Sequence, residues 1–324
     1  MKAVVCNEFG PPENLAVEEV DDPVPGPGQL LIDVHAAAVT FPDTLMLEDK
    51  YQFKTGLPYV PGTEGAGVVR AVGEGVEGWS VGDRAAGGLG TTGAYAEQMV
   101  FPAAAARRVP DNVSFEAVTG LNYAHGTTLY GLRYRADLQA GETMLVTGAA
   151  GAVGLSAIEI GKLMGARVIA AASSDEKLDL CREAGADETI NYSTENLKER
   201  AKELSGGQGV DVVYDCVGGD KAEQALRAIG WEGRFLVIGF TAGIPAIPLN
   251  LALLKSCQII GVFYGAMTGR EPEKSAAISD QLIEWVAAGD LAPHVSARYT
   301  LDRASEALRA LIDRKAAGKL VVTP

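Results

Sequence analysis

The stretch Met144-Leu145-Val146-Thr147-Gly148-Ala149-Ala150-Gly151-Ala152-Val153-Gly154 decides how the chain is expected to fold. A mostly apolar run ends at Thr147, and a helix-like pattern follows over 152–164. Gly151 lets the backbone approach a pyrophosphate, and Gly154 lets the helix pack closely on the strand. The helix N-terminus adds free N–H groups and a positive dipole end, which suit phosphates.

This turn departs from the usual G-x-G-x-x-G pattern, because Ala149 stands at the first glycine and Gly148 precedes it. Taken alone, it also fits a tight structural turn without a ligand. Its position at the start of a strand and helix alternation favours a dinucleotide site. The predicted pyrophosphate-binding residues are Gly148, Ala150, Gly151, Ala152, Val153 and Gly154.

Short apolar runs alternate with helical patterns after the turn. Because both faces of a doubly wound sheet are covered, its strands read as continuous apolar runs. The pattern predicts an α/β fold whose Rossmann part is a doubly wound, parallel, six-stranded sheet. The expected strands are 143–147, 167–172, 186–190, 210–215, 234–238 and 257–263.

The first ~120 residues differ, since short Val-rich runs are closed there by Gly and Pro turn signals, as in a compact β unit. Helical patterns at 275–288 and 303–314 and a last strand at 319–322 are expected to return to this unit. The predicted division is therefore 1–122 with 265–324 for the β domain, and 123–264 for the sheet domain.

Composition narrows the class of partner. The 324 residues carry a formal net charge of -14, so nucleic-acid phosphates and anionic lipids are unlikely partners. No signal peptide is recognised at the start, and four cysteines are scattered without paired spacing. We therefore expect a cytoplasmic enzyme that binds neither nucleic acid nor membranes.

The second expected strand indicates which dinucleotide binds. It ends Ala171-Ala172-Ser173-Ser174, with Lys177 just beyond and no carboxylate at its tip. NAD-binding sites usually place Asp or Glu there for the ribose 2′-OH, whereas hydroxyls and an ammonium suit a 2′-phosphate. NADPH is therefore predicted. Alternatively, Ser173 caps the next helix and Lys177 is a solvated charge.

Several longer motifs together carry a family resemblance. The chain resembles the medium-chain dehydrogenase/reductase superfamily, and within it the zinc-independent NADPH:quinone oxidoreductase branch. The resemblance implies a GroES-like β domain beside the Rossmann domain, and a homodimer. The motifs are Thr40-Phe41-Pro42-Asp43-Thr44-Leu45, Leu57-Pro58-Tyr59-Val60-Pro61-Gly62-Thr63-Glu64-Gly65-Ala66-Gly67, Val72-Gly73, Gly82-Asp83-Arg84, Gly93-Ala94-Tyr95-Ala96-Glu97 and the glycine turn.

The resemblance also implies further cofactor contacts. They comprise a nicotinamide contact, a 2′-phosphate pocket that adds a tyrosine to the serines and lysine above, residues along the nicotinamide ribose, and a lysine near the cofactor. For the tyrosine, Tyr192, the alternative is plain packing after the third strand. Thr127 would contact the nicotinamide, and Ser173, Ser174, Lys177 and Tyr192 would bind the 2′-phosphate. Gly239, Phe240, Val262 and Phe263 would lie along the nicotinamide ribose, and Lys319 would lie near the cofactor.

Zinc-dependent relatives need three N, S or O ligands for a catalytic zinc. Here Thr40 stands where their first Cys would be, and Thr63-Glu64 where their Gly-His-Glu would be. No Cys occurs between Cys6 and Cys181, so a four-Cys structural lobe is also excluded. No metal is predicted, and His35, His125 and His294 are expected to pack, cap or hydrogen-bond.

Without a strong Lewis acid, the predicted reaction is hydride transfer from NADPH to a quinone or an α,β-unsaturated carbonyl compound. Thr40 and Tyr51 are the candidate hydrogen-bond donors to the acceptor oxygen, although Tyr51 equally fits a wall of the pocket. One alternative is an enoyl-thioester reductase, with Arg107-Arg108 or Arg133 and Arg135 receiving CoA phosphates. Another is a non-catalytic NADPH-binding structural protein.

The run Ser256-Cys257-Gln258-Ile259-Ile260-Gly261-Val262-Phe263 is expected to form the last strand of the sheet. An apolar edge strand invites pairing with its own copy. The predicted homodimer therefore uses 256–263.

Overall fold

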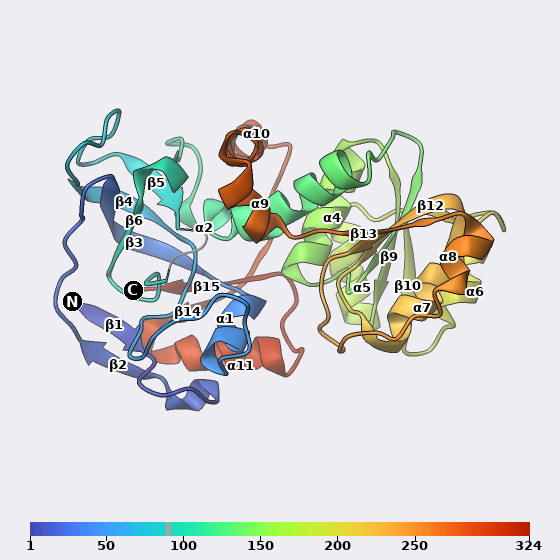
Figure 1. Ribbon diagram of the computed structural model, residues 1–324, viewed down its shortest axis with the longest axis horizontal. Coiled ribbons are helices and arrows are strands. Elements are labelled where there is room, and N and C mark those ends of the chain that lie inside the picture. Colours follow the sequence, from blue (N-terminus) through green and yellow to red (C-terminus); the bar gives the residue numbers. More distant parts are fainter. Residues whose placement is uncertain (89–91) are drawn as a thin grey trace. The chain divides into compact units, whose positions relative to one another are not determined.

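A computed structural model describes residues 1–88 and 92–324 and divides the chain into two units (Figure 1). The first comprises Met1–Tyr123 and Glu273–Pro324, and the second Ala124–Pro272. The division expected from the sequence differs mainly at the second boundary, because helix α9 (Tyr264–Arg270) belongs to the second unit. The Tyr264 ring packs so closely on Gly126 that a Cβ there would lie 2.8 Å from it.

A parallel six-stranded sheet forms the centre of the second unit, and this part of the predicted fold is confirmed. Its strand order is β10-β9-β8-β11-β12-β13. The bounds are β8 (Thr143–Thr147), β9 (Arg167–Ala172), β10 (Glu188–Asn191), β11 (Val210–Asp215), β12 (Ile229–Val237) and β13 (Gln258–Gly261). β12 begins earlier than expected, because its pairing with β11 jumps from Ile229 to Arg234 through a bulge.

Helices cover both faces of this sheet, as right-handed crossovers require. Helices α6 and α7 share a core cluster with the strands, which includes Leu197, Leu226 and Phe235. Helices α4 and α5 pack against β8, β9 and β10. The helical bounds are η3 (Asn122–Gly126), α3 (Thr127–Leu129), η4 (Tyr130–Arg135), α4 (Ala152–Leu163), α5 (Asp175–Glu183), α6 (Leu197–Leu204), α7 (Gly219–Ala228) and α8 (Asn250–Lys255).

The first unit has a two-stranded sheet, β1 (Lys2–Val5) with β2 (Ala16–Glu19), and a larger mixed sheet. The larger sheet has the order β14-β15-β3-β4-β5-β7, and β6 also pairs with β3. Its strands are β3 (Gln29–Val39), β4 (Gly65–Val72), β5 (Arg84–Gly87), β6 (Gln98–Pro102), β7 (Arg107–Arg108), β14 (Val295–Thr300) and β15 (Lys319–Thr323).

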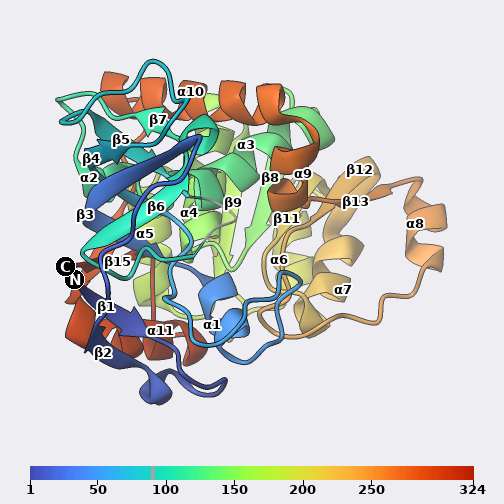
Figure 2. The ribbon, with the colours of Figure 1, turned by 60° about the vertical axis from the view of Figure 1, so that its left-hand side comes forward.

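The C-terminal segment returns to this sheet, because β15 pairs antiparallel with β3. Helices α1 and α11 lie side by side beneath the strands (Figure 2). The helical bounds are η1 (Pro12–Asn14), α1 (Phe41–Leu47), η2 (Ala103–Ala105), α2 (Phe115–Val118), α10 (Pro272–Ala288), η5 (Leu301–Arg303) and α11 (Ala304–Ile312). None of the helices in 1–88 and 92–324 combines the length and apolar character that crossing a bilayer needs.

Candidate functional site

The carboxyl ends of the parallel strands form one edge of the second unit, and the fold brings most of the predicted cofactor residues there. Ligands of doubly wound sheets bind at this edge. In strand order, the residues that follow the strands are Tyr192 after β10, Ser173 and Ser174 after β9, 148–154 after β8, Gly239 and Phe240 after β12, and Val262 and Phe263 after β13.

The glycine turn has the geometry of a phosphate site. Gly148 adopts φ +62°, a conformation that L side chains rarely adopt, and the N–H of Gly151 donates to its carbonyl over 3.1 Å. Gly151 is the N-cap of α4 and supplies no side-chain cap. The first N–H groups of the helix, from Ala152 and Val153, therefore have no intrahelical acceptor and are available to an anion.

The two later glycines of the turn have different roles. A Cβ on Gly154 would lie 2.4 Å from the Gly148 carbonyl oxygen, so the fold itself requires glycine there. A Cβ on the exposed Gly151 would meet only that same oxygen, at an ordinary 3.5 Å. The protein leaves open space beside the Gly151 backbone, which a pyrophosphate fits. The residues present therefore fit a bound dinucleotide.

Asp215, at the end of β11, braces this turn and was not found from the sequence. Its buried carboxylate accepts hydrogen bonds from the Thr147 hydroxyl and from the N–H groups of Val217 and Gly218, the last two at 3.2 Å. Burial raises the pKa of this carboxyl group despite those bonds. The one signal in the sequence was an acidic residue that closes an apolar strand.

The loop after β9 corrects one alternative from the sequence, since Ser174, not Ser173, is the N-cap of α5. The Ser174 hydroxyl accepts from the N–H of Lys177 at 3.4 Å. Asp175 lies in the first helical turn, and its carboxylate accepts from the Asn191 amide at 2.9 Å. The carboxylate that follows the tip of β9 in the chain, that of Asp175, is therefore hydrogen-bonded to Asn191 at the end of β10.

The helical segment 122–135 is tied to the glycine turn by buried hydroxyl groups. The Thr128 Oγ1 atom lies 2.6 Å from Ser156 Oγ and 2.8 Å from the Tyr214 hydroxyl. Ser156 in turn donates to the Val153 carbonyl at 2.8 Å. This network holds the half-buried Thr127, a predicted nicotinamide contact, in a fixed relation to α4.

Two of the histidines also have identified neighbours. The Nε2 atom of His125 lies 2.8 Å from Glu159, and the His35 ring is 4.7 Å from that of Phe115. These contacts agree with packing and hydrogen bonding. Among residues 1–88 and 92–324, no group of three or more His, Cys, Asp or Glu side chains is arranged to hold a metal ion.

In the first unit, Thr40 is buried and its hydroxyl is engaged by Asp43. The Thr40 N–H and Oγ1 both donate to Asp43 Oδ2 at 2.8 Å, and the Tyr95 hydroxyl donates to the same oxygen at 3.0 Å. Burial raises the pKa of Asp43 to about 6. While Asp43 is ionised, Thr40 directs its hydrogen to Asp43 and presents only lone pairs elsewhere, which opposes its predicted role as a donor.

Tyr51 is half-buried, and its ring lies 5.7 Å from that of Phe53 in an edge-on arrangement. Burial, followed by the charge of Asp43, raises the pKa of the Tyr51 phenol. The phenol therefore keeps its proton at neutral pH, as a hydrogen-bond donor must.

Lys319 is the one predicted cofactor residue in the first unit. It lies on β15, buried, and its ammonium donates to the carbonyls of Ala117 and Thr119 at 2.9 and 3.0 Å.

Glu64, at a zinc-ligand position of the family, is also buried and accepts from the N–H groups of Asn122 and Tyr123, both at 3.1 Å. Burial raises the pKa of Glu64 to about 7.

Comparisons with known proteins agree with this architecture. Residues 26–111 match the alcohol dehydrogenase GroES-like domain, and 152–283 match the zinc-binding dehydrogenase domain, which confirms the expected GroES-like and Rossmann-like fold. The chain is 40% identical to a quinone oxidoreductase-like protein 2 homolog of Nematostella vectensis, covering 99% of this chain and 88% of the relative.

Two further relatives are similar over nearly their whole length. A quinone oxidoreductase of Pseudomonas aeruginosa is 36% identical, over 100% of this chain and 99% of the relative. The crystal structure of Escherichia coli quinone oxidoreductase complexed with NADPH has a TM-score of 0.92 against this fold, with 29% identity and 100% of both chains covered.

Proposed function

Because the chain belongs to the medium-chain dehydrogenase/reductase superfamily, in its quinone oxidoreductase branch, we propose that it reduces quinones or α,β-unsaturated carbonyl compounds with NADPH and without zinc. The protein is an oxidoreductase of this branch, and NADPH is its cofactor. The observation that carries the choice of cofactor is the tip of β9, where Ser173 and Ser174 stand and no carboxylate is placed.

When bound, NADPH supplies the hydride. The chain's own contribution is to bind and orient it. The N–H groups at the start of α4 bind the pyrophosphate, and Asp215 keeps the glycine turn in place. The Thr128 hydroxyl network fixes the segment that carries Thr127. Ser173, Ser174, Lys177 and Tyr192 are the proposed 2′-phosphate site, and Gly239, Phe240, Val262 and Phe263 the proposed ribose contacts.

Negative charge develops on the acceptor oxygen during hydride transfer, so a nearby donor lowers the barrier. Tyr51 is the stronger of the two predicted donors, because its phenol keeps its proton while the Thr40 hydroxyl is directed at Asp43. We expect Tyr51→Phe to lower kcat by about 10- to 100-fold. Thr40→Val is expected to have a smaller effect, and unchanged kcat in both variants would remove both residues from the proposal.

Zinc independence rests on the residues at the ligand positions. Thr40 offers no charged ligand, and Glu64 is already bonded to two backbone N–H groups. Elemental analysis of the purified protein is expected to find no stoichiometric zinc. We also expect the protein to keep its full activity after prolonged dialysis against a chelator.

The reaction class is tested by NADPH oxidation with 1,4-benzoquinone, 2-cyclohexenone and crotonyl-CoA, each compared with NADH. We expect turnover with the quinone, the enone or both, and a higher kcat/KM for NADPH. Turnover confined to crotonyl-CoA would instead identify an enoyl-thioester reductase. Cofactor binding without turnover of any acceptor would favour the non-catalytic alternative.

The structure bears on one of the two CoA entrances considered for the enoyl-thioester alternative, the one at Arg107 and Arg108. Arg107 forms an ion pair with Asp280 at 3.0 Å, and Arg108 forms one with Asp83 at 3.0 Å. Both guanidinium groups are thus already neutralised inside the first unit. A CoA phosphate would compete with these carboxylates, but only weakly at Arg108, whose side chain is 58% exposed.

The proposal includes a cytoplasmic homodimer. All four cysteines are free thiols, as expected in a reducing compartment. The edge strand β13 exposes Ile259, and the adjoining α8 exposes Leu253 at 81% and Leu254 at 67%. Such an apolar edge suits pairing with a second copy. Light scattering is expected to give a dimer mass, and Ile259→Lys is expected to give a monomer.

A further inference from the structure

Lys221 lies at the cofactor edge, although no motif in the sequence singled it out. It is in the first turn of α7 and reaches back to the loop after β10, where its Nζ donates to the Tyr192 carbonyl at 3.0 Å. The same Nζ lies 5.3 Å from the centroid of the Tyr192 ring. β10 pairs with β9 so that Asn191 is opposite Ala172, which places Tyr192 beside Ser173.

The ammonium retains binding capacity after this contact. It has three N–H donors, and the Tyr192 carbonyl takes one of them. In the part of the chain that the structure describes, Lys221 forms no ion pair with a carboxylate. Two acidic residues in and beside this loop are engaged elsewhere: Asp175 accepts from the Asn191 amide, and Glu195 accepts from the Asn191 N–H and pairs with Arg200. A half-buried cation without an anionic partner, in a chain of net charge -14, is suited to an anion supplied from outside.

We propose that Lys221 is a cofactor-specificity residue, whose ammonium binds the 2′-phosphate of NADPH together with Lys177. This inference rests on the proposed site for NADPH at this edge. It adds a cation from α7 to a pocket that the sequence placed only on the segments after β9 and β10. A lysine is a point charge that suits a phosphate, and two lysines offset its double charge better than one.

The competing explanation is that Lys221 only fastens α7 to the loop after β10. Lys255 provides a matched control for this explanation. Its Nζ donates to the Ile229 carbonyl at 2.6 Å, which is the same kind of bond. Ile229 is the first residue of β12, so Lys255 lies at the opposite edge of the sheet. A purely structural lysine should behave alike at both positions.

The test uses the full-length protein and two nucleotides that differ only in the 2′-phosphate, adenosine 2′,5′-bisphosphate and 5′-AMP. Calorimetry measures the affinity of each for the wild type and for Lys221→Met, Lys221→Gln and Lys255→Met. Gln can still donate to the Tyr192 carbonyl but carries no charge. The KM values for NADPH and NADH and the melting temperatures are measured in parallel.

We expect both Lys221 variants to bind the bisphosphate about tenfold more weakly and 5′-AMP unchanged. The KM for NADPH should rise by a similar factor, with the KM for NADH and kcat unaffected, and Lys255→Met should alter none of these. If Lys221→Gln prefers the bisphosphate as strongly as the wild type does, or if both nucleotides bind equally more weakly, the proposed role of Lys221 is overturned but the NADPH site is not. A wild type without any preference for the bisphosphate would overturn the proposed NADPH site as well.

Discussion

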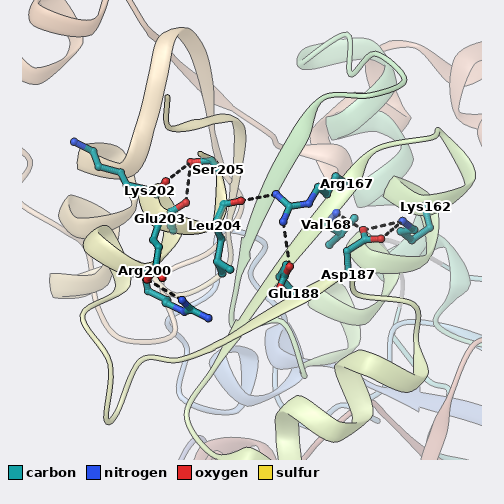
Figure 3. A network of polar contacts seen from close by, with 11 residues as sticks. Lys162, Arg167, Val168, Asp187, Glu188, Arg200, Lys202, Glu203, Leu204 and Ser205 are labelled. Atoms are coloured by element: carbon teal, nitrogen blue, oxygen red, sulfur yellow. Dashed lines mark hydrogen bonds and ion pairs between the residues drawn. The ribbon is translucent and has the colours of Figure 1, made fainter. Parts of the chain in front are cut away.

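The two edges of the second unit's sheet are built in opposite ways. At the amino edge, charged groups satisfy one another. Asp187 accepts from the Lys162 ammonium and the Val168 N–H, each at 2.7 Å, and Arg167 donates to the Leu204 carbonyl and to Glu188 (Figure 3). At the carboxyl edge stand glycines, serine hydroxyls and lysines, together with the first N–H groups of α4, which no side chain caps.

Because of this difference, we expect the amino edge to contribute to stability and the carboxyl edge to contribute to ligand binding. A group already paired within the protein gains little by meeting a ligand, because it must first give up its partner. The N-terminus of α4 and the ammonium of Lys221 hold donors that an external phosphate can satisfy. The comparison therefore predicts that substitutions at the two edges change different measurements.

The largest effect is expected for Gly154→Val at the carboxyl edge. Its Cβ would lie 2.4 Å from the Gly148 carbonyl oxygen and 2.6 Å from the Ala149 Cα. Because backbone has to move, we expect a loss of about 3 kcal/mol in the free energy of unfolding, together with the loss of NADPH binding. Urea unfolding and fluorescence titration measure the two. A variant of normal stability would show that the turn is not tightly packed.

Gly151→Val is expected to weaken NADPH binding without lowering stability, whereas Gly154→Val should lower both. Gly151 has φ -77° and ψ 166°, which any residue adopts, and its Cβ would meet the chain only at 3.5 Å. The melting temperature should therefore stay near the wild-type value. The affinity for NADPH should fall at least tenfold, since the side chain would occupy the pyrophosphate approach. Unaltered affinity would place the pyrophosphate elsewhere.

The two edges should also differ in the sign of their pH dependence. Burial raises the pKa of Asp215, so its protonated form is favoured on folding, and its contribution is lost as pH rises through the folded-state pKa. Asp187 is different: burial opposes ionisation, but the Lys162 and Val168 bonds outweigh it and lower its pKa. Its contribution is therefore lost as pH falls through the folded-state pKa.

We expect unfolding free energies, measured from pH 3 to 8, to show this difference between variants. Asp215→Asn should remove part of the decline in stability as pH rises above the ordinary pKa of an Asp side chain, by about 1 kcal/mol. Asp187→Asn should remove part of the decline towards acid, by less than about 1 kcal/mol because its side chain is 34% exposed. The same sign of change in both variants would contradict the assigned pKa directions.

The smallest effect is expected for Lys162→Met at the amino edge. The Lys162 and Asp187 side chains are 35% and 34% exposed, so their ion pair is screened by solvent. We expect a loss of less than about 1 kcal/mol in stability and no change in the KM for NADPH. A marked rise in that KM would show that the two edges are not independent.

Local patterns accounted for much of the fold. The strand at 143–147, the glycine turn and the helix after it were predictable because apolar periodicity and glycine spacing act over a few residues. The serines at the end of β9 were likewise visible as a local substitution for the usual carboxylate. The early start of β12 was not, because it depends on a bulge in its pairing with β11.

Local sequence patterns could not show which hydrogen-bond partners a side chain has. Thr40 was identified as a candidate donor, but only the fold shows that its hydroxyl hydrogen is directed to Asp43, which also accepts from Tyr95. Asp215 and Lys221 were missed because their partners lie 68 and 29 residues away in the chain.

By itself, the sequence determined the two-part α/β architecture, the dinucleotide turn and the absence of a carboxylate at the tip of β9, because each follows from residues close together in the chain. Tertiary structure alone decided which ends of which strands lie side by side. The order of β10, β9 and β8 brings Tyr192, Ser173 and Gly151 to one edge, and the crossover through α7 adds Lys221. The physical reason is that crossover connections set strand order, and strand order sets which side chains can meet at a ligand.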